Sequence, residues 1–229
     1  RRKDGIVIRG AKAHQTGAIN SHEHLLMPTI MMRPEDKDYA LCCAVPAEAG
    51  GITYIYGRQA SDLRKLDASP EGKIDCGNSC YGGQECLVIF DDVFVPAERV
   101  FMDGEYDFTS LLVECFAGYH RQSYGGCKVG VGDVMIGAAA AIADYNGVKN
   151  ASHVKDKIIE MCHLNETMFS CGIACSAQGA RTGSGVYLID ILLANICKQN
   201  VTRFPYEIAR LLQDIAGGLM VTAPSAKDW

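Results

Sequence analysis

Residues 119–128 read Tyr119-His120-Arg121-Gln122-Ser123-Tyr124-Gly125-Gly126-Cys127-Lys128. This segment combines a thiol that can ligate a soft metal, an imidazole, a phenol and two cations. Its glycine pair lies where a helix should continue, and glycine inside a helix costs about 1 kcal/mol relative to alanine. We therefore expect the backbone to deform here or to approach another group closely.

The chain on both sides of this segment has a helical pattern that begins at about Phe108. Asp107 is a suitable N-cap for a helix that continues through Tyr119. After the glycine pair, residues 129–145 are rich in alanine and valine, which suits a tightly packed helix. The sequence therefore predicts two helical stretches on either side of the glycine pair, where the backbone deforms or approaches another group closely.

The rest of the chain also favours helices. Ser152 can cap a helix that ends at about Ala177. Residues 186–216 are helical in pattern, with Pro205 at a break or a new first turn. Gly217 and Gly218 then end this stretch. The spacing of these segments predicts antiparallel helices.

The part of the chain before residue 105 is rich in β-strand patterns. Short apolar or alternating runs are separated by Gly, Pro, Asn and Asp; they cover residues 6–10, 40–45, 52–56, 87–90 and 93–96. Residues 61–83 are polar and predict a long connection. We therefore expect an α+β fold, with a β-rich domain at residues 1–106 and a helical domain at residues 107–229.

Composition excludes several classes of function. The net charge of -5 leaves no basic surface for nucleic acid. No run of eighteen apolar residues predicts a transmembrane helix, and no signal peptide is apparent. The eleven scattered cysteines are an odd number, which favours a reducing cytoplasm over a disulfide scaffold. The first residue is not Met, so we expect the chain to begin inside a longer protein.

His120 and Cys127 lie seven residues apart. On a straight helix they share a face but are separated by about 10 Å along the axis. A zinc ion needs ligands within about 2.0–2.3 Å, so a straight helix cannot bring both to one ion. A distorted helix or a cluster of several irons could accept both. A core cysteine and a hydrogen-bonded histidine beside a packing contact would give the same spacing.

Several motifs together resemble one family, and they cover essentially the whole chain. They are residues 9–17, 82–85, 120–128, 203–210 and 213–220. These segments are similar to the 4-hydroxybutyryl-CoA dehydratase family, within the 4-hydroxyphenylacetate 3-hydroxylase and acyl-CoA dehydrogenase-like flavoproteins. The resemblance implies a β-barrel-like middle domain followed by an antiparallel helix bundle, with an N-terminal helical domain outside this chain.

The resemblance assigns a [4Fe–4S] cluster to His120 and Cys127. Two further cysteine ligands would come from a C-x3-C segment in the upstream domain. Cys76/Cys80 and Cys171/Cys175 have that spacing but lie in other regions, so we interpret them as incidental. The catalytic residues implied by the resemblance are His120, Glu85, Tyr124 and Lys128, where His120 would also remove a proton from the substrate.

The resemblance also assigns FAD. His14, Gln15, Thr16 and Gly17 would contact the isoalloxazine ring, although a polar β-turn has the same composition. Gln213, Asp214, Gly217 and Gly218 would approach the pyrophosphate, although glycine at this point is equally a helix C-cap. No G-x-G-x-x-G motif is present, so a doubly wound fold is not expected. His22 and His24 flank Glu23 without the spacing of a metal site.

The implied reaction is radical dehydration of 4-hydroxybutyryl-CoA to crotonyl-CoA, with vinylacetyl-CoA isomerisation as a side activity. A hydro-lyase of this kind would be a cytoplasmic homo-oligomer, a tetramer in the family. Two alternatives remain open from the sequence. One is a two-component FAD-dependent aromatic monooxygenase of the 4-hydroxyphenylacetate type, and the other is an inactive fragment.

Overall fold

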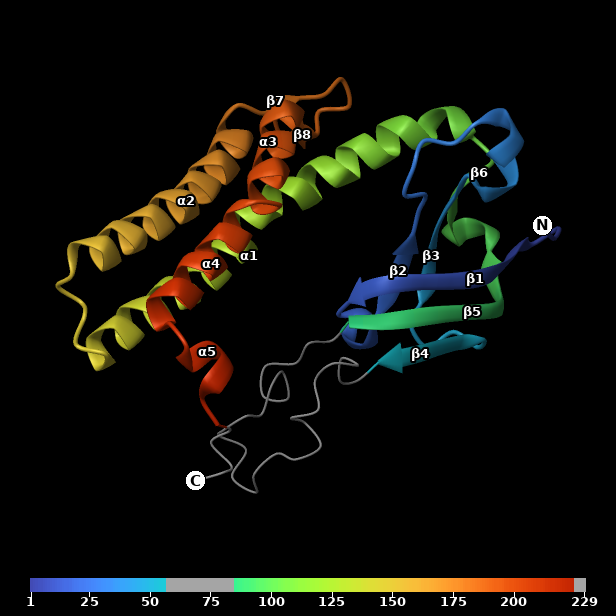
Figure 1. Ribbon diagram of the computed structural model, residues 1–229. Coiled ribbons are helices and arrows are strands. Elements are labelled where there is room, and N and C mark those ends of the chain that lie inside the picture. Colours follow the sequence, from blue (N-terminus) through green and yellow to red (C-terminus); the bar gives the residue numbers. More distant parts are fainter. Residues whose placement is uncertain (57–84, 225–229) are drawn as a thin grey trace. The chain divides into compact units, whose positions relative to one another are not determined.

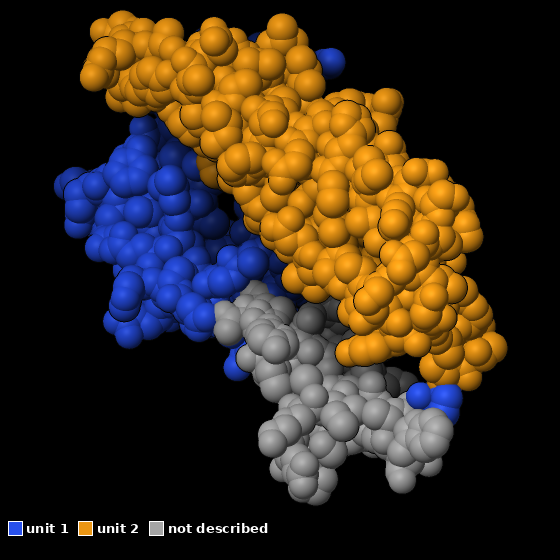
Figure 2. Space-filling model, turned by 90° about the vertical axis from the view of Figure 1, so that its left-hand side faces the viewer, with its two compact units in different colours: residues 1–110, 224–229 blue, residues 111–223 orange. Residues whose placement is uncertain are grey.

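The structure is a computed structural model that describes residues 1–56 and 85–224 (Figure 1). The predicted connection at 61–83, with Cys76 and Cys80, lies outside the described residues. Two compact units divide the chain, one over residues 1–110 and one over residues 111–223 (Figure 2). The first is built mainly of strands and the second of helices, so the predicted α+β class is confirmed.

Two antiparallel sheets of three strands form the first unit. One sheet has the order β1–β5–β4, from Gly5–Thr16, Glu85–Pro96 and Ile52–Tyr56. The other has the order β2–β3–β6, from Glu23–Leu26, Leu41–Pro46 and Val100–Asp103. Short 3-10 helices connect the strands at Ala18–Asn20, Pro34–Tyr39 and Ala97–Arg99, and a fourth at Tyr106–Phe108 leads from β6 to the first helix.

One apolar core joins the two sheets. Alternate residues of a strand point to the same face, and the buried side chains of β5 follow this alternation on each side of Asp91 and Asp92. The buried members from β1, β3 and β5 are Ile6, Cys43, Val45, Cys86, Val88, Phe90, Val93 and Val95. This core holds the ends of β1 and β5 in the register on which the site described below depends.

The second unit consists of helices and one small hairpin. Its long helices are α1 (Thr109–Tyr145) and α2 (Ser152–Ala177), and α2 runs back along α1 (Figure 1). The hairpin strands β7 (Ala180–Arg181) and β8 (Tyr187–Leu188) lead to α3 (Ile191–Val201), α4 (Phe204–Ala216) and α5 (Leu219–Thr222).

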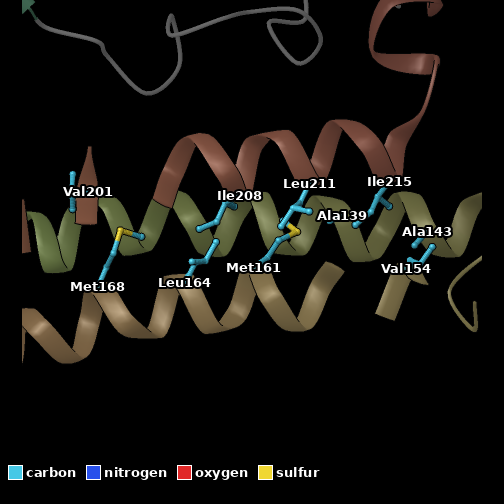
Figure 3. Packing of buried hydrophobic residues seen from close by; sticks show 10 residues of the cluster. All are labelled: Ala139, Ala143, Val154, Met161, Leu164, Met168, Val201, Ile208, Leu211 and Ile215. Carbon is cyan, nitrogen blue, oxygen red and sulfur yellow. The ribbon is translucent and has the colours of Figure 1, made fainter. Parts of the chain in front are cut away.

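The core of this unit lies among α1, α2 and α4. Figure 3 shows side chains of α2 and α4 pointing toward one another beside the small residues of α1. Met161, Met168 and Ile208 are fully buried there. Ala139 and Ala143 of α1 are also fully buried, and their small side chains let the other helices approach closely.

The glycine pair does not interrupt α1, which is a single helix from Thr109 to Tyr145. The predicted distortion is therefore wrong, and close approach is the reason for Gly125. A Cβ added there would lie 2.8 Å from Gly172 Cα and 3.1 Å from Met168 O of α2. Gly126 points the other way, and an added Cβ would meet nothing within 4 Å.

Several helix ends differ from the prediction. Asp107 lies in a 3-10 helix and does not cap α1, where the Thr109 hydroxyl donates to Tyr106 O at 2.6 Å. Ser152 is the first helical residue of α2 instead of its cap. The helix predicted from residue 186 begins only at Ile191, because the Asp190 side chain accepts from Leu193 N–H at 2.7 Å. Pro205 does begin a new helix, α4.

Strands were also missed or divided. β2 and β6 were not predicted, since each has only four residues. The two runs at 87–90 and 93–96 form one strand, β5, whose pairing with β1 shifts near Asp92. Asp92 has a positive φ of 51°, which turns the strand without ending it.

By length and composition, the helical stretch Tyr106–Tyr145 could cross a membrane, and 22% of its most apolar window is buried. The prediction from uninterrupted apolar runs missed this feature, because charged and polar residues divide the apolar ones. The core helix of a soluble protein passes the same test.

Candidate functional site

The residues predicted to contact flavin form the end of β1. The register between β1 and β5 shifts between Lys12 and Gln15, and His14 within this bulge has φ of 60°. Gly17 follows with φ of 71°, a left-handed conformation that favours glycine. The segment therefore leaves the sheet abruptly and presents its polar groups at the strand end.

Glu85 lies directly opposite this segment. It pairs with Thr16 at the end of the β1–β5 ladder, and the Thr16 hydroxyl donates a hydrogen bond to the Glu85 carboxylate. The two residues were predicted separately, from motifs far apart in the sequence. The structure brings them together, because antiparallel pairing of β1 and β5 places the last residue of one strand against the first of the other.

A pocket of about 200 Å³ opens beside Thr16 and Gly17. Its polar lining is Lys12, Gln15, Thr16, Ser21, Glu23 and His24, and apolar residues of β5 and β2 complete it. Lys12 Nζ donates to Met27 O at 3.2 Å. The pocket thus combines a cation, a carboxylate, hydroxyls and an imidazole over an apolar base.

The sequence did not predict a role for His24, whose ring has a hydrogen-bonding partner at each nitrogen. Its Nε2 lies 2.5 Å from the Tyr54 hydroxyl, and its Nδ1 lies 3.3 Å from Ser21 Oγ. Burial lowers the pKa of the imidazole below its ordinary value. The alternation of Glu23, His24 and Leu25 in a strand could have indicated that His24 points inward, but nothing local indicated Tyr54.

The second group of predicted residues lies on α1. The His120 ring stacks on Phe116 with centroids 6.0 Å apart, and its other side meets the edge of Tyr124 at 4.9 Å. Lys198 of α3 lies over the Tyr124 ring, with Nζ 4.3 Å from its centroid. These contacts fix the direction of the imidazole and the phenol.

Cys127 lies two turns beyond His120, on the same helical face and exposed. Because α1 is continuous, the two cannot bind one metal ion together. Within residues 1–56 and 85–224, no three His, Cys, Asp or Glu side chains are grouped as a metal site. His120 and Cys127 are therefore two exposed side chains with donor atoms on one face of α1, and a metal-binding role for them stays a prediction.

Other thiols gather in the interior of the second unit. Cys175 and Cys197 are fully buried, and Cys171 lies beside both. Burial, reinforced by Cys171, raises the pKa of Cys175 to about 12 and that of Cys197 to about 11. A neutral thiol is a poor metal ligand, so the raised pKa of Cys175 supports the interpretation of the Cys171/Cys175 pair as incidental.

The residues predicted to approach the FAD pyrophosphate end α4. Gly217 has φ of 63° and donates its N–H to Gln213 O at 2.9 Å, so it is the C-cap. Gly218 begins α5. Asp214 forms an ion pair with Lys157 of α2 at 2.5 Å, and this contact lowers the pKa of its carboxyl. The C-cap interpretation is confirmed, and contact with FAD stays a prediction.

Comparison with known proteins gives concordant matches. The model of the N-terminal part of 4-hydroxyphenylacetate 3-hydroxylase matches residues 1–102, and that of the C-terminal part matches residues 109–229. The chain is 66% identical over all 229 residues to 4-hydroxybutyryl-CoA dehydratase/vinylacetyl-CoA-Δ-isomerase of Clostridium aminobutyricum, and covers 46% of that protein.

Solved structures agree. The 4-hydroxybutyryl-CoA dehydratase from N. maritimus, described as oxygen tolerant, has 62% identity and a TM-score of 0.92 over the whole chain and 45% of its own length. The oxygenase component of 4-hydroxyphenylacetate 3-monooxygenase, complexed with FAD and 4-hydroxyphenylacetate, has 25% identity and a TM-score of 0.80 over the whole chain and 47% of its own. The chain spans about half the length of these relatives.

The fold and the shared sequence define a chain with the fold of the 4-hydroxyphenylacetate 3-monooxygenase oxygenase components. Within it, the chain belongs to the 4-hydroxyphenylacetate 3-hydroxylase family.

Proposed function

We propose that the protein containing this chain is a hydro-lyase that dehydrates 4-hydroxybutyryl-CoA to crotonyl-CoA and also isomerises vinylacetyl-CoA. The observation that carries the proposal is the contrast in identity between two branches of the family. The chain is 66% identical to the dehydratase but 25% identical to the monooxygenase component of Thermus thermophilus. Both matches cover at least 98% of the chain, so the contrast is not confined to one motif.

FAD is the first cofactor of the proposed enzyme, and the end of β1 suits it. Thr16 and Gly17 border a polar pocket, and the bulge at His14 exposes backbone groups that can hydrogen-bond a heteroaromatic ring. The Thr16 hydroxyl donates to Glu85, so Glu85 Oε1 acts as an acceptor and the carboxylate is held at the strand end. This carboxylate can orient the substrate or accept a proton from it.

A [4Fe–4S] cluster is the second proposed cofactor. His120 and Cys127 supply an imidazole and a thiol on one exposed face of α1, and such soft donors suit iron–sulfur clusters. The other ligands of the proposed set come from outside the described residues. When bound, the two cofactors supply one-electron chemistry and a Lewis-acidic iron for the hydroxyl group.

The chain's own residues would position the substrate and move its protons. His120, whose ring is held between Phe116 and Tyr124, can accept the proton from C2 of the substrate at a ring nitrogen. The Tyr124 hydroxyl and the Lys128 ammonium can donate hydrogen bonds to the substrate hydroxyl or thioester oxygen. A homotetramer and a cytoplasmic location complete the proposal.

Substitution of Cys127 tests the cluster. The protein should be purified without oxygen and analysed for iron, acid-labile sulfide and FAD. We expect Cys127→Ser to lose iron and sulfide and to abolish dehydration of 4-hydroxybutyryl-CoA, because a hydroxyl ligates iron poorly. Cys162→Ser is the matched control, since Cys162 is also an exposed helical cysteine but lies on α2.

A two-component aromatic monooxygenase gives the opposite result. The wild-type protein would then contain no iron, and it would hydroxylate 4-hydroxyphenylacetate with reduced flavin and oxygen. Iron-free wild-type protein with this activity would refute the dehydratase proposal. Iron that is retained in Cys127→Ser would refute the assignment of that ligand.

A further inference from the structure

The side chains of Ser21, His24 and Tyr54 form a hydrogen-bonded series at the pocket. Their geometry determines which nitrogen of His24 can bind a proton. The Tyr54 hydroxyl donates to Ala47 O at 2.6 Å, so its oxygen accepts from His24 Nε2, 2.5 Å away. His24 Nε2 therefore carries a proton whether the ring is neutral or charged. Nδ1 is the nitrogen that gains or loses a proton.

The environment of Nδ1 accommodates both states. Nδ1 lies 3.3 Å from Ser21 Oγ, and the Ser21 hydroxyl is 2.7 Å from Ala18 O. When the ring is charged, Nδ1–H donates to Ser21 Oγ and the hydroxyl donates to Ala18 O. When the ring is neutral, the hydroxyl can turn to Nδ1, and Ala18 O keeps the backbone N–H of Ser21 at 3.2 Å. A proton can thus arrive or leave without movement of heavy atoms.

The series opens to the pocket on one side only. Ser21 and His24 line the pocket together with Thr16 and Gly17, whereas Tyr54 is not part of its lining. The volume of about 200 Å³ is smaller than the roughly 300–1,000 Å³ of complete small-molecule sites. The pocket therefore suits one polar edge of a larger ligand.

We propose that the edge of a flavin ring lies in this pocket against Ser21 and His24, that His24 takes up a solvent proton when the flavin is reduced, and that Tyr54 is a positioning residue. The inference rests on the proposed function, which assigns the flavin to residues 14–17. Reduction by dithionite transfers an electron pair to the ring, and the ring takes one proton from solvent. The added negative charge favours uptake of a further solvent proton at His24 Nδ1.

The charged and titratable side chains on the elements around His24 are Lys12 of β1, Glu23 of β2, Cys42 and Cys43 of β3, Tyr54 of β4, Glu85 and Cys86 of β5, and Arg99 of the 3-10 helix Ala97–Arg99. Glu23 is paired with Arg99 at 2.8 Å, and Glu85 is bonded to Thr16. Burial lowers the pKa of His24, which favours the neutral ring as the state that can accept a proton.

Anaerobic spectroelectrochemical titration of the FAD-containing protein at several pH values tests the inference. The slope of midpoint potential against pH reports the protons taken up with the electrons. We expect the wild-type slope to steepen in the pH range where His24 gains its proton on reduction. His24→Gln should lose this steeper region, and Tyr54→Phe should move it. His22→Gln is the matched control and should retain it, because His22 is exposed and does not line the pocket.

If the His24→Gln protein fails to fold or to bind flavin, a second measurement on the wild-type protein still tests the inference. NMR titration of the wild-type His24 ring should show a higher pKa with reduced than with oxidised flavin. An unchanged His24 pKa, or equal slopes for the wild type and His24→Gln, would overturn the inference alone. Wild-type protein that binds no flavin would instead overturn the proposed function, and this inference with it.

Discussion

His24 shows how one residue can connect two strands and a pocket. Its imidazole reaches Tyr54 of β4 on one side and Ser21 on the other. The sequence displays the His-Glu-His run but not these contacts, because Tyr54 is brought near only by the core that joins the two sheets. The sequence likewise does not show that Thr16 and Glu85 are in contact, because only the register of β1 and β5 brings them together.

The lowered pKa of His24 predicts a pH dependence of stability. The unfolded chain binds a proton at the ordinary histidine pKa of about 6.5, whereas the folded chain resists protonation because the ring is buried. The contribution of the buried, neutral His24 ring to the free energy of unfolding is therefore fully present above about pH 6.5. It is lost as the pH decreases toward the folded pKa.

Thermal unfolding between pH 5 and pH 7.5 checks this expectation, using protein free of flavin. His24→Gln should reduce the loss of Tm on acidification, and His22→Gln should leave it as in the wild type. Equal acid sensitivity in the wild type and His24→Gln would show that other groups are responsible.

Among the helices, the glycine pair of α1 separates two effects of glycine. Gly125 allows close contact with α2, whereas Gly126 only lowers helix propensity. Gly125→Ala should destabilise the protein by about 1–3 kcal/mol, the usual cost of overpacking, because its Cβ would press on the backbone of α2. Gly126→Ala should stabilise it by up to about 1 kcal/mol, because alanine is the better helix former and the added methyl meets nothing.

Urea unfolding of the two variants provides the measurement, and each is the control for the other. A similar loss of stability in both would mean that the helix is distorted at the pair after all. Gains in both would mean that α2 can move away from Gly125 at little cost.

Helices were easier to predict than strands in this chain. The extent of α2 was predicted within one residue from Ser152, and the start of α4 from Pro205, and both are local signals. β2 and β6 have four residues each, too few for alternation to be recognised. The start of α3 depended on one side chain, Asp190, and α1 continued through its glycines because packing against Gly172 compensates for their poor helix propensity.

For the whole molecule, the exposed apolar surface of α1 raises the question of what covers it. Leu111, Phe116 and Val134 are each more than half exposed. Charged side chains such as Arg121 and Asp133 lie along the same helix, and they are costly in the middle of a bilayer. We therefore expect protein, instead of lipid, to cover this helix.

Vesicle flotation and sedimentation together test this expectation. The protein should remain at the bottom of the gradient when mixed with phospholipid vesicles, and it should sediment as a homo-oligomer in detergent-free buffer. Flotation with the vesicles, or a monomer at micromolar concentration, would contradict the expectation.

The contact between Gly125 and Gly172 limits how this sequence can vary. Where two side chains are in contact, a substitution that enlarges one can be compensated by a substitution that makes the other smaller. Neither Gly125 nor Gly172 has a side chain that could become smaller. We therefore expect each position to be intolerant on its own, with no second change nearby that restores the original spacing of the two backbones.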